Sequence, residues 1–376
     1  MKIAYISIDD PRNHISWSGL KLNIYNILKK LNHDVKIIGP LRDYNRIPFI
    51  IQREAYKLFN QKYESERKTY LSKIYAKKIY DSLKLEKFDL IFTSDTYLLS
   101  YLNTKTPIIL WTDVTFKTYY SHYFKKFKIN QKSFLEANNL EKLSLKKINK
   151  IILTSEWSKQ ETIKNYKINK NKIQIIPFGS NINENRKVII KNKKNDILKL
   201  ITVGVDWDRK GIDKSIQVVK FLNDNGCKSE LTIIGSTRKK NFPKFIKQIG
   251  FLNKNIPTDN QRIKNYFKNS DLHILMTKSE ACGVVFAEAN SYGLYNITHD
   301  VGGVSGMIRN NHNGKLFKIN DSYKKIGNYI IELNNDKKKF LDLRKKSLEF
   351  YISNLSWKNN SIKLNKLFEY VLKNDS

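Results

Sequence analysis

Short apolar runs alternate with amphipathic stretches along almost the whole chain. Apolar runs of this length are typical of buried strands, and most of the stretches between them have helical spacing. Between the first two runs, for example, apolar residues recur on one helical face from Leu20 to Leu31. In the first half, strands are therefore predicted at residues 2–8, 34–40, 89–94, 107–113, 150–155 and 172–179.

The polar, asparagine-rich residues 181–195 separate this series from a second one. In this second series, helices are expected at residues 211–225 and 283–292. Only helices are expected after residue 320, the last of them at 357–372. Strands that alternate with helices indicate parallel sheets covered by helices. The sequence thus predicts an α/β protein with two doubly wound domains. The strands of the second half are predicted at residues 198–204, 230–236, 272–279, 295–299 and 314–317.

The chain carries a formal net charge of +34, from 69 Lys and Arg against 35 Asp and Glu in 376 residues. This balance favours anionic partners: nucleic acid, phosphorylated ligands or an anionic membrane surface. Most lysines are scattered among Asn and Ile, so an ordinary solvated surface also explains them. The sequence has no zinc-ligand spacing or recognition motif, and the basic triplets at 238–240 and 337–339 are short. A nucleic-acid-binding protein is kept as an alternative, with no specific nucleic acid expected.

Two cysteines, Cys227 and Cys282, are too few for a disulfide framework and favour a reducing compartment. Asp9 ends the apolar N-terminal run too early for a signal peptide, and no run of about 18 apolar residues is present to span a bilayer. Residues 119–127 mix aromatic residues with lysines, which suits either a membrane interface or a helix with a buried aromatic face. We expect a cytoplasmic protein, with peripheral contact to the inner face of the membrane left open.

In open α/β sheets, ligands bind at the carboxyl ends of strands, where helix N-termini present free amides. Glu280 and Glu288 lie around the start of one predicted helix at such a junction. Each carboxylate can accept hydrogen bonds from two neighbouring hydroxyls, as on a sugar ring or a ribose. The alternative is enrichment of glutamate in a first helical turn, which accounts for only one of the two.

Three further junctions carry residues that suit a bound ligand, and two of them, at Gly19 and at Arg209-Lys210, suit a phosphate. Arg209 and Lys210 open a predicted helix, where the helix dipole disfavours cations unless an anion lies between them and the helix. A solvated basic turn is the alternative there. Gly19 and the Gly302-Gly303 pair allow a ligand to approach the backbone closely, or simply form tight turns. No G-x-G-x-x-G motif is present, so a nicotinamide dinucleotide is not supported.

With these residues, the sequence resembles the retaining nucleotide-sugar glycosyltransferases of the group 1, or family 4, class. The E-x7-E motif of that family runs from Glu280 to Glu288, and Lys210 matches its phosphate-binding lysine. Residues 207–211, WDRKG, look like a W-x-R-K-G subgroup. Further matches cover nearly the whole chain, at residues 155–157, 176–179, 250–254, 289–293 and 302–303.

The resemblance implies the GT-B fold, with two Rossmann-like domains facing a central cleft. The expected parts are an acceptor-binding domain at 1–183, a nucleotide-sugar-binding domain at 184–355 and a C-terminal helix at 356–376 that packs back on the first domain. The implied activity is retaining transfer from a nucleotide diphosphate sugar to a glycan or lipid-linked acceptor, in cell-envelope or surface polysaccharide synthesis such as that of lipopolysaccharide. Neither a cofactor nor a metal is expected. A GT-B nucleotide-sugar epimerase is the nearest enzymatic alternative.

The resemblance also implies roles for single residues. Glu280 would bind hydroxyls of the transferred sugar, and Glu288 those of the ribose. Lys210 and Arg209 would neutralise the departing diphosphate, helped by the amide of Gly19 across the cleft. The remaining residues expected to bind the donor are Cys282, Gly283 and Val284, whose backbone would lie close to the sugar, together with Gly204 and Lys254.

Two departures from the family pattern bear on these roles. Many members have a histidine before the aspartate that follows the fourth strand, but here the place reads Trp111-Thr112-Asp113. Asp113 is therefore kept as a candidate catalytic residue without that histidine. Many relatives also have an arginine where this chain has Val205, so Arg209 is expected to substitute for it.

Overall fold

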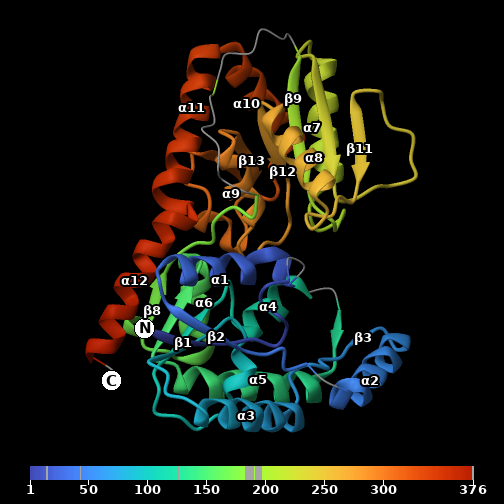
Figure 1. Ribbon diagram of the computed structural model, residues 1–376. Coiled ribbons are helices and arrows are strands. Elements are labelled where there is room, and N and C mark those ends of the chain that lie inside the picture. Colours follow the sequence, from blue (N-terminus) through green and yellow to red (C-terminus); the bar gives the residue numbers. More distant parts are fainter. Residues whose placement is uncertain (14–15, 43, 125–126, 183–189, 191–196, 375–376) are drawn as a thin grey trace. The chain divides into compact units, whose positions relative to one another are not determined.

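The computed structural model describes the chain except for residues 14–15, 43, 125–126, 183–189, 191–196 and 375–376 (Figure 1). The chain forms two compact units. The first comprises Met1–Ile176 together with Asn360–Ser376, and the second comprises Pro177–Asn359. The domain boundary predicted at residue 183 lies outside the described residues, as does most of the asparagine-rich stretch.

The first unit is built on a six-stranded parallel sheet with the order β2-β1-β4-β5-β7-β8 (Figure 1). All six strands predicted for this half are present, and each is shorter than predicted. Residues just beyond the strands, such as Ile8 and Ser155, are buried although they lie outside the hydrogen-bonded ladder. The strands are β1 (Lys2–Ile6), β2 (Asp34–Ile38), β4 (Leu90–Thr93), β5 (Ile108–Trp111), β7 (Lys150–Leu153) and β8 (Ile173–Ile175).

Helices cover this sheet through apolar faces that the spacing predicted. In the first helix, for instance, Leu20, Ile24, Ile27 and Leu28 are all buried. The helices of the unit are α1 (Leu20–Lys30), α2 (Ile47–Leu58), α3 (Thr69–Lys84), α4 (Phe116–Tyr123), α5 (Gln131–Lys147) and α6 (Glu156–Tyr166). Two short strands, β3 (Gln61–Lys62) and β6 (Lys128–Ile129), pair outside the main sheet.

Of the two alternatives for the aromatic segment at 119–127, the structure shows a helix with a buried aromatic face, and contact with a membrane interface stays a prediction. Phe116 and Tyr120 of α4 are buried in a small aromatic cluster beside α5. Tyr119 is 41% exposed and Phe127 is 50% exposed. The helix therefore has a buried aromatic face, and further aromatic side chains remain accessible to solvent.

The second unit repeats the architecture, with a parallel sheet in the order β11-β10-β9-β12-β13-β14 (Figure 1). The five predicted strands are present, and β11 was not predicted. Its sequence, IKQIG, is half polar because the strand lies at the edge of the sheet and is only partly buried. The strands are β9 (Leu198–Val203), β10 (Ser229–Ile234), β11 (Ile246–Gly250), β12 (Leu272–Leu275), β13 (Tyr295–His299) and β14 (Gly314–Phe317).

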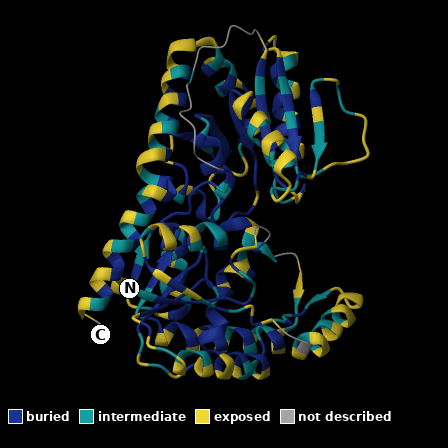
Figure 2. Cartoon of the chain, in the orientation of Figure 1, coloured by how far each residue is buried: buried dark blue, intermediate teal, exposed yellow. Residues whose placement is uncertain are grey.

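The helices of the second unit pack against this sheet, and the buried residues lie along the strands (Figure 2). The helices of this unit are α7 (Ile212–Asp224), α8 (Pro257–Lys268), α9 (Val284–Ser291), α10 (Tyr323–Asn335) and α11 (Lys337–Phe350). The last helix, α12 (Trp357–Asn374), begins in the second unit, and its residues from Asn360 onward group with the first unit.

Candidate functional site

Three strand-to-helix junctions of the second unit meet at one edge of its sheet. Strands β9, β12 and β13 are neighbours and parallel, so their carboxyl ends lie side by side. Main-chain hydrogen bonds join the three loops that follow them. Lys278 N donates to Arg209 O at 2.7 Å, and Gly303 N donates to Glu280 O at 2.9 Å. The loops therefore form one surface on which their side chains converge.

Glu280 is the centre of this surface and is only 5% exposed. Its Oε1 accepts hydrogen bonds from Arg209 Nη1 at 3.1 Å, from Thr277 Oγ1 at 3.4 Å and from Lys210 Nζ. Burial by itself raises the pKa of this carboxyl group, but the positive charges of Lys210 and Arg209 outweigh burial and hold the pKa below its usual value. Glu280 is therefore a buried, ionised carboxylate bound to two cations.

The backbone geometry around Lys210 directs its side chain toward Glu280. Its stem lies against Gly204 at the end of β9, where an added Cβ would come within 2.7 Å of Lys210 Cγ. Arg209 is fixed by a second contact, in which Nη1 donates to the carbonyl of Ser279 at 2.9 Å. Gly204, which was predicted to bind the donor, thus makes room for the stem of the Lys210 side chain.

Gly211 closes the same junction, as the N-cap of α7 with a φ of +63°. A Cβ on this residue would lie 1.8 Å from the carbonyl oxygen of Met276, just after β12. Only glycine fits between the two loops, because any side chain here meets backbone atoms that cannot move aside. The W-x-R-K-G pattern therefore ends in a glycine for a steric reason.

Replacing Gly211 with alanine is expected to lower the free energy of unfolding by at least about 2 kcal/mol, because backbone strain and overpacking add. Gly226→Ala is the matched control. Gly226 also has a positive φ, +79°, but its added Cβ would meet no described atom within 4 Å. Its expected loss is limited to backbone strain, about 1 kcal/mol. Chemical denaturation measures both variants, and equal losses would contradict the steric role of Gly211.

The second glutamate of the motif lies on α9 and forms its own pair. Glu288 is 3% exposed, and its Oε1 accepts a hydrogen bond from Lys254 Nζ in the loop that follows β11. Gly283 is the N-cap of α9 with a φ of +78°, and a Cβ there would come within 2.6 Å of the Phe286 ring. Cys282, just before it, is buried. The motif thus presents two buried carboxylates, each paired with a cation from another loop.

Two buried residues of this site were not predicted. Thr277 Oγ1 donates to Glu280 Oε1, and the carbonyl of Thr277 lies 2.9 Å from Nδ1 of His299. Burial lowers the pKa of His299 to about 4, and its Nε2 lies 3.0 Å from Lys214 Nζ. Both residues lie at the same sheet edge as Glu280. Their positions at or just beyond strand ends are the only signal in the sequence.

The first unit contains the other two predicted site residues. Gly19 is the N-cap of α1 with a φ of +89°. Asp113 follows β5, where its Oδ1 accepts a hydrogen bond from Val114 N at 2.8 Å, and its carbonyl accepts one from Ser158 Oγ. The structure therefore brings Arg209, Lys210 and Glu280 together, with the Lys254–Glu288 pair in the same unit. The roles of Gly19 and Asp113 stay predictions.

Within the described residues, no group of three or more His, Cys, Asp or Glu residues has the arrangement of a metal site. None of the described helices combines the length and the apolar character needed to cross a membrane.

Two Rossmann-like α/β units in one chain are the domain composition of the GT-B class of fold. Two family models match this chain. Glycosyltransferase Family 4 matches residues 22–184, and Glycosyl transferases group 1 matches residues 181–350. The chain thus carries the family 4 and group 1 domains of glycosyltransferases on a GT-B fold.

Solved structures share this fold at low sequence identity. Sucrose-phosphate synthase from Thermosynechococcus elongatus aligns with a TM-score of 0.69 at 14% identity, over 99% of both chains. HepE of Anabaena, in complex with UDP, aligns with a TM-score of 0.68 at 15% identity, over 98% of this chain and all of that one.

Relatives with curated descriptions are more similar in sequence. An uncharacterized 41.2 kDa protein in the cps region of Klebsiella pneumoniae is 24% identical over 275 residues, which is 69% of this chain and 74% of the relative. The UDP-Gal:alpha-D-GlcNAc-diphosphoundecaprenol alpha-1,3-galactosyltransferase of Escherichia coli is 26% identical over 278 residues, 69% of this chain and 70% of the relative.

Proposed function

We propose that this protein is a retaining glycosyltransferase that moves a sugar from a nucleotide diphosphate sugar to a glycan or lipid-linked acceptor. The observation that carries the proposal is the buried Glu280 bound to Lys210 and Arg209, with the buried Glu288 paired with Lys254 in the same unit. Hydroxyl-binding carboxylates and phosphate-binding cations are the two kinds of group that a nucleotide diphosphate sugar requires. The galactosyltransferase relative, which acts on a lipid diphosphate, supports cell-envelope polysaccharide synthesis as the setting.

In this proposal the donor binds to the second unit. Glu280 binds hydroxyls of the transferred sugar and Glu288 those of the ribose, while the backbone of Cys282, Gly283 and Val284 approaches the sugar closely. Gly204 and Lys254 complete the donor-binding set. Because both glutamates are already paired with cations, they are held in place to accept hydrogen bonds from hydroxyl groups.

The chemical step breaks the bond between the anomeric carbon and the diphosphate oxygen, and negative charge accumulates on the diphosphate. Lys210 and Arg209 stabilise that charge most strongly in the transition state, which lowers the barrier. In a retaining transfer, the acceptor hydroxyl attacks the face that the diphosphate leaves. Its proton passes to a departing phosphate oxygen, so no side-chain base is required. No metal or cofactor takes part in this scheme.

We propose a cytoplasmic enzyme that contacts the inner face of the membrane peripherally, an arrangement that the net charge of +34 favours for an anionic membrane. The alternatives weighed from the sequence, a nucleotide-sugar epimerase and a nucleic-acid-binding protein, are not favoured by the two glycosyltransferase domains.

A panel of nucleotide sugars tests the proposed function. One donor is expected to raise the melting temperature and to be hydrolysed slowly in the absence of an acceptor, with the anomeric configuration of the released sugar retained by NMR. A second nucleotide sugar that appears rapidly without an acceptor would identify an epimerase instead. No stabilisation by any nucleotide sugar, with salt-sensitive binding to RNA, would favour the nucleic-acid-binding alternative.

A further inference from the structure

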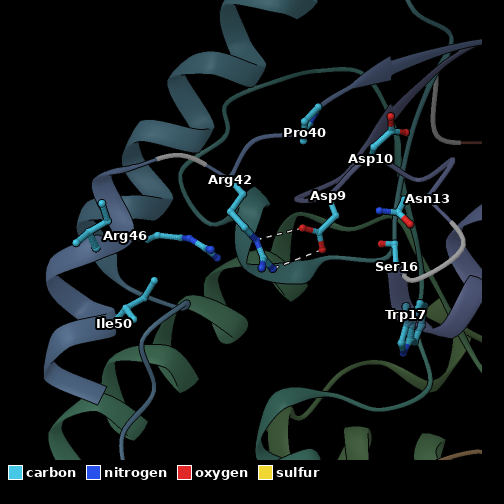
Figure 3. Close-up of a pocket in the computed structure, with 10 residues that line it drawn as sticks. Asp9, Asp10, Asn13, Ser16, Trp17, Pro40, Arg42, Arg46 and Ile50 are labelled. Atoms are coloured by element: carbon cyan, nitrogen blue, oxygen red, sulfur yellow. Dashed lines mark hydrogen bonds and ion pairs between the residues drawn. The ribbon is translucent and has the colours of Figure 1, made fainter. Parts of the chain in front are cut away.

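The first unit contains a cavity of about 900 Å³ that none of the predicted roles uses. Figure 3 shows its two sides. Asn13, Ser16 and Trp17 of the loop between β1 and α1 lie on one side, and Arg46 and Ile50 at the start of α2 lie on the other. We propose that this cavity binds the acceptor, as an uncharged sugar ring that carries an apolar aglycone. The inference rests on the proposed function and adds the chemical class of the acceptor.

The loop side of the cavity has the groups that bind sugars. Asp10 is held in place by Arg12, whose Nη2 donates to Oδ2 at 2.8 Å and whose backbone N donates to Oδ1 at 2.9 Å. Ser16 is only 8% exposed, and its Oγ has no hydrogen-bond partner among the described residues. Figure 3 shows that this hydroxyl is directed into the cavity. A buried hydroxyl without a partner is costly unless a ligand satisfies it, and sugar hydroxyls can do so.

Trp17 stands beside this hydroxyl in an unusual backbone conformation. Its φ is +48° and that of Ser18 is +57°, so two consecutive non-glycine residues occupy the left-handed region. Such a conformation is costly and persists when the surroundings impose it, often at binding sites. It places an indole ring at the edge of a polar cavity, where its face can pack against the apolar face of a sugar ring.

Charge at the centre of the cavity is balanced. Figure 3 shows the ion pair between Arg42 and Asp9, with Arg42 Nε 3.1 Å from Asp9 Oδ1. Arg46 Nη1 lies 3.3 Å from Glu66 Oε1. The lining holds two carboxylates and two guanidinium groups, each with an ion-pair partner. Balanced charges favour an uncharged ring with many hydroxyls over a free phosphate.

The other side of the cavity continues into an exposed apolar helix face. Ile47 and Ile50 line the cavity from α2, a helix with no buried residue. Ile47 is 46% exposed and Ile51 is 63% exposed, and they lie one turn apart on the same face of the helix. The charged Glu54 ends this apolar stretch in the next turn. A short apolar stretch that begins in a sugar-binding cavity suits the aglycone of a ligand whose sugar lies inside it. An aglycone long enough to reach Ile51 would remove apolar surface from water.

Alkyl glycosides test this pairing of polar and apolar sides. The probes are methyl and decyl glycosides of glucose, galactose and N-acetylglucosamine, used below the micelle concentration with the donor found for the protein. For the sugar that is accepted, the KM of the decyl glycoside is expected to be at least about tenfold lower than that of the methyl glycoside. Calorimetric binding of the same two probes should show the same difference without turnover.

Variants assign the difference to the cavity. Ile47→Gln together with Ile50→Gln should bring the KM of the decyl glycoside close to that of the methyl glycoside. Trp17→Ala should raise the KM of both probes about tenfold or more, and Trp17→Phe should recover part of it. Leu85→Gln is the control, because Leu85 is 80% exposed in the same unit and lies outside the cavity. It should keep the wild-type preference.

The outcomes separate this inference from the proposed function. Donor turnover with equal KM values for the two glycosides would overturn the inference and leave the proposed function intact. Loss of the preference in Leu85→Gln as well would also overturn it, because the effect would then not belong to the cavity. Absence of donor turnover with every nucleotide sugar would instead contradict the proposed function, while calorimetry would still report on the cavity.

Discussion

Replacing Glu280 with alanine is expected to lower kcat at least ~100-fold, the scale of removing one preorganised electrostatic contact. Glu280 is almost fully buried and accepts hydrogen bonds from both Arg209 and Lys210. In the proposed site it also binds hydroxyls of the transferred sugar. Its loss therefore removes a sugar contact and releases the two cations from their positions. Steady-state transfer with the identified donor and acceptor measures the effect.

The matched control for this variant is Glu230→Ala. Glu230 also pairs with a lysine of the second unit, Lys247, whose Nζ lies 2.8 Å away, but that pair is on the surface. The activity of Glu230→Ala should stay near that of the wild type, because an exposed ion pair contributes little to stability. Melting temperatures separate a damaged fold from a damaged site. Near wild-type kcat in a well-folded Glu280→Ala protein would remove Glu280 from the catalytic site.

Lys210→Ala is expected to lower kcat by a similar factor, at least ~100-fold, with a smaller change in the KM of the donor. The ammonium group is assigned to charge that develops on the diphosphate as the bond to the sugar breaks. An interaction that strengthens in the transition state appears mainly in kcat, whereas a contact made equally in the bound donor appears in KM. Single-turnover measurements with saturating donor distinguish the two cases.

Lys247→Ala provides the corresponding control, since it removes an exposed lysine from the surface pair with Glu230. Lys210→Arg is the informative companion, because it keeps the charge while changing its shape and reach. Partial activity in Lys210→Arg together with the loss in Lys210→Ala would support an electrostatic role. An effect of Lys210→Ala confined to the KM of the donor would contradict stabilisation of the leaving group.

The alternation of apolar and amphipathic segments was sufficient to predict eleven strands of the two main sheets, because burial on both faces makes parallel strands continuously apolar. The same burial extends past the strand ends, as at Ile8 and Ser155, so the predicted strands were too long. β11 was missed because an edge strand is only partly buried and carries polar residues. Hydrophobic periodicity thus reports burial, and it predicts hydrogen bonding only where the two coincide.

The residues of the candidate site also include some that the sequence could identify and some that it could not. Glu280, Glu288 and Lys210 could be chosen from the sequence, because carboxylates and cations at strand-to-helix junctions are unusual and form a family motif. Thr277 and His299 could not, because nothing in the local sequence distinguishes them from buried strand-end residues. The cavity of the first unit was also missed, since Arg42 and Arg46 follow a different strand from Asp9 and Trp17.

The sequence by itself therefore determined the α/β class, the positions of the junctions and the residue types available there, because these depend on local periodicity and on the chemistry of single side chains. Only the tertiary structure decided which of these residues act together. The order of strands β9, β12 and β13 in the sheet brings Arg209 and Lys210 to Glu280, about seventy positions later in the chain. That pairing depends on contacts between distant segments, which no local pattern encodes.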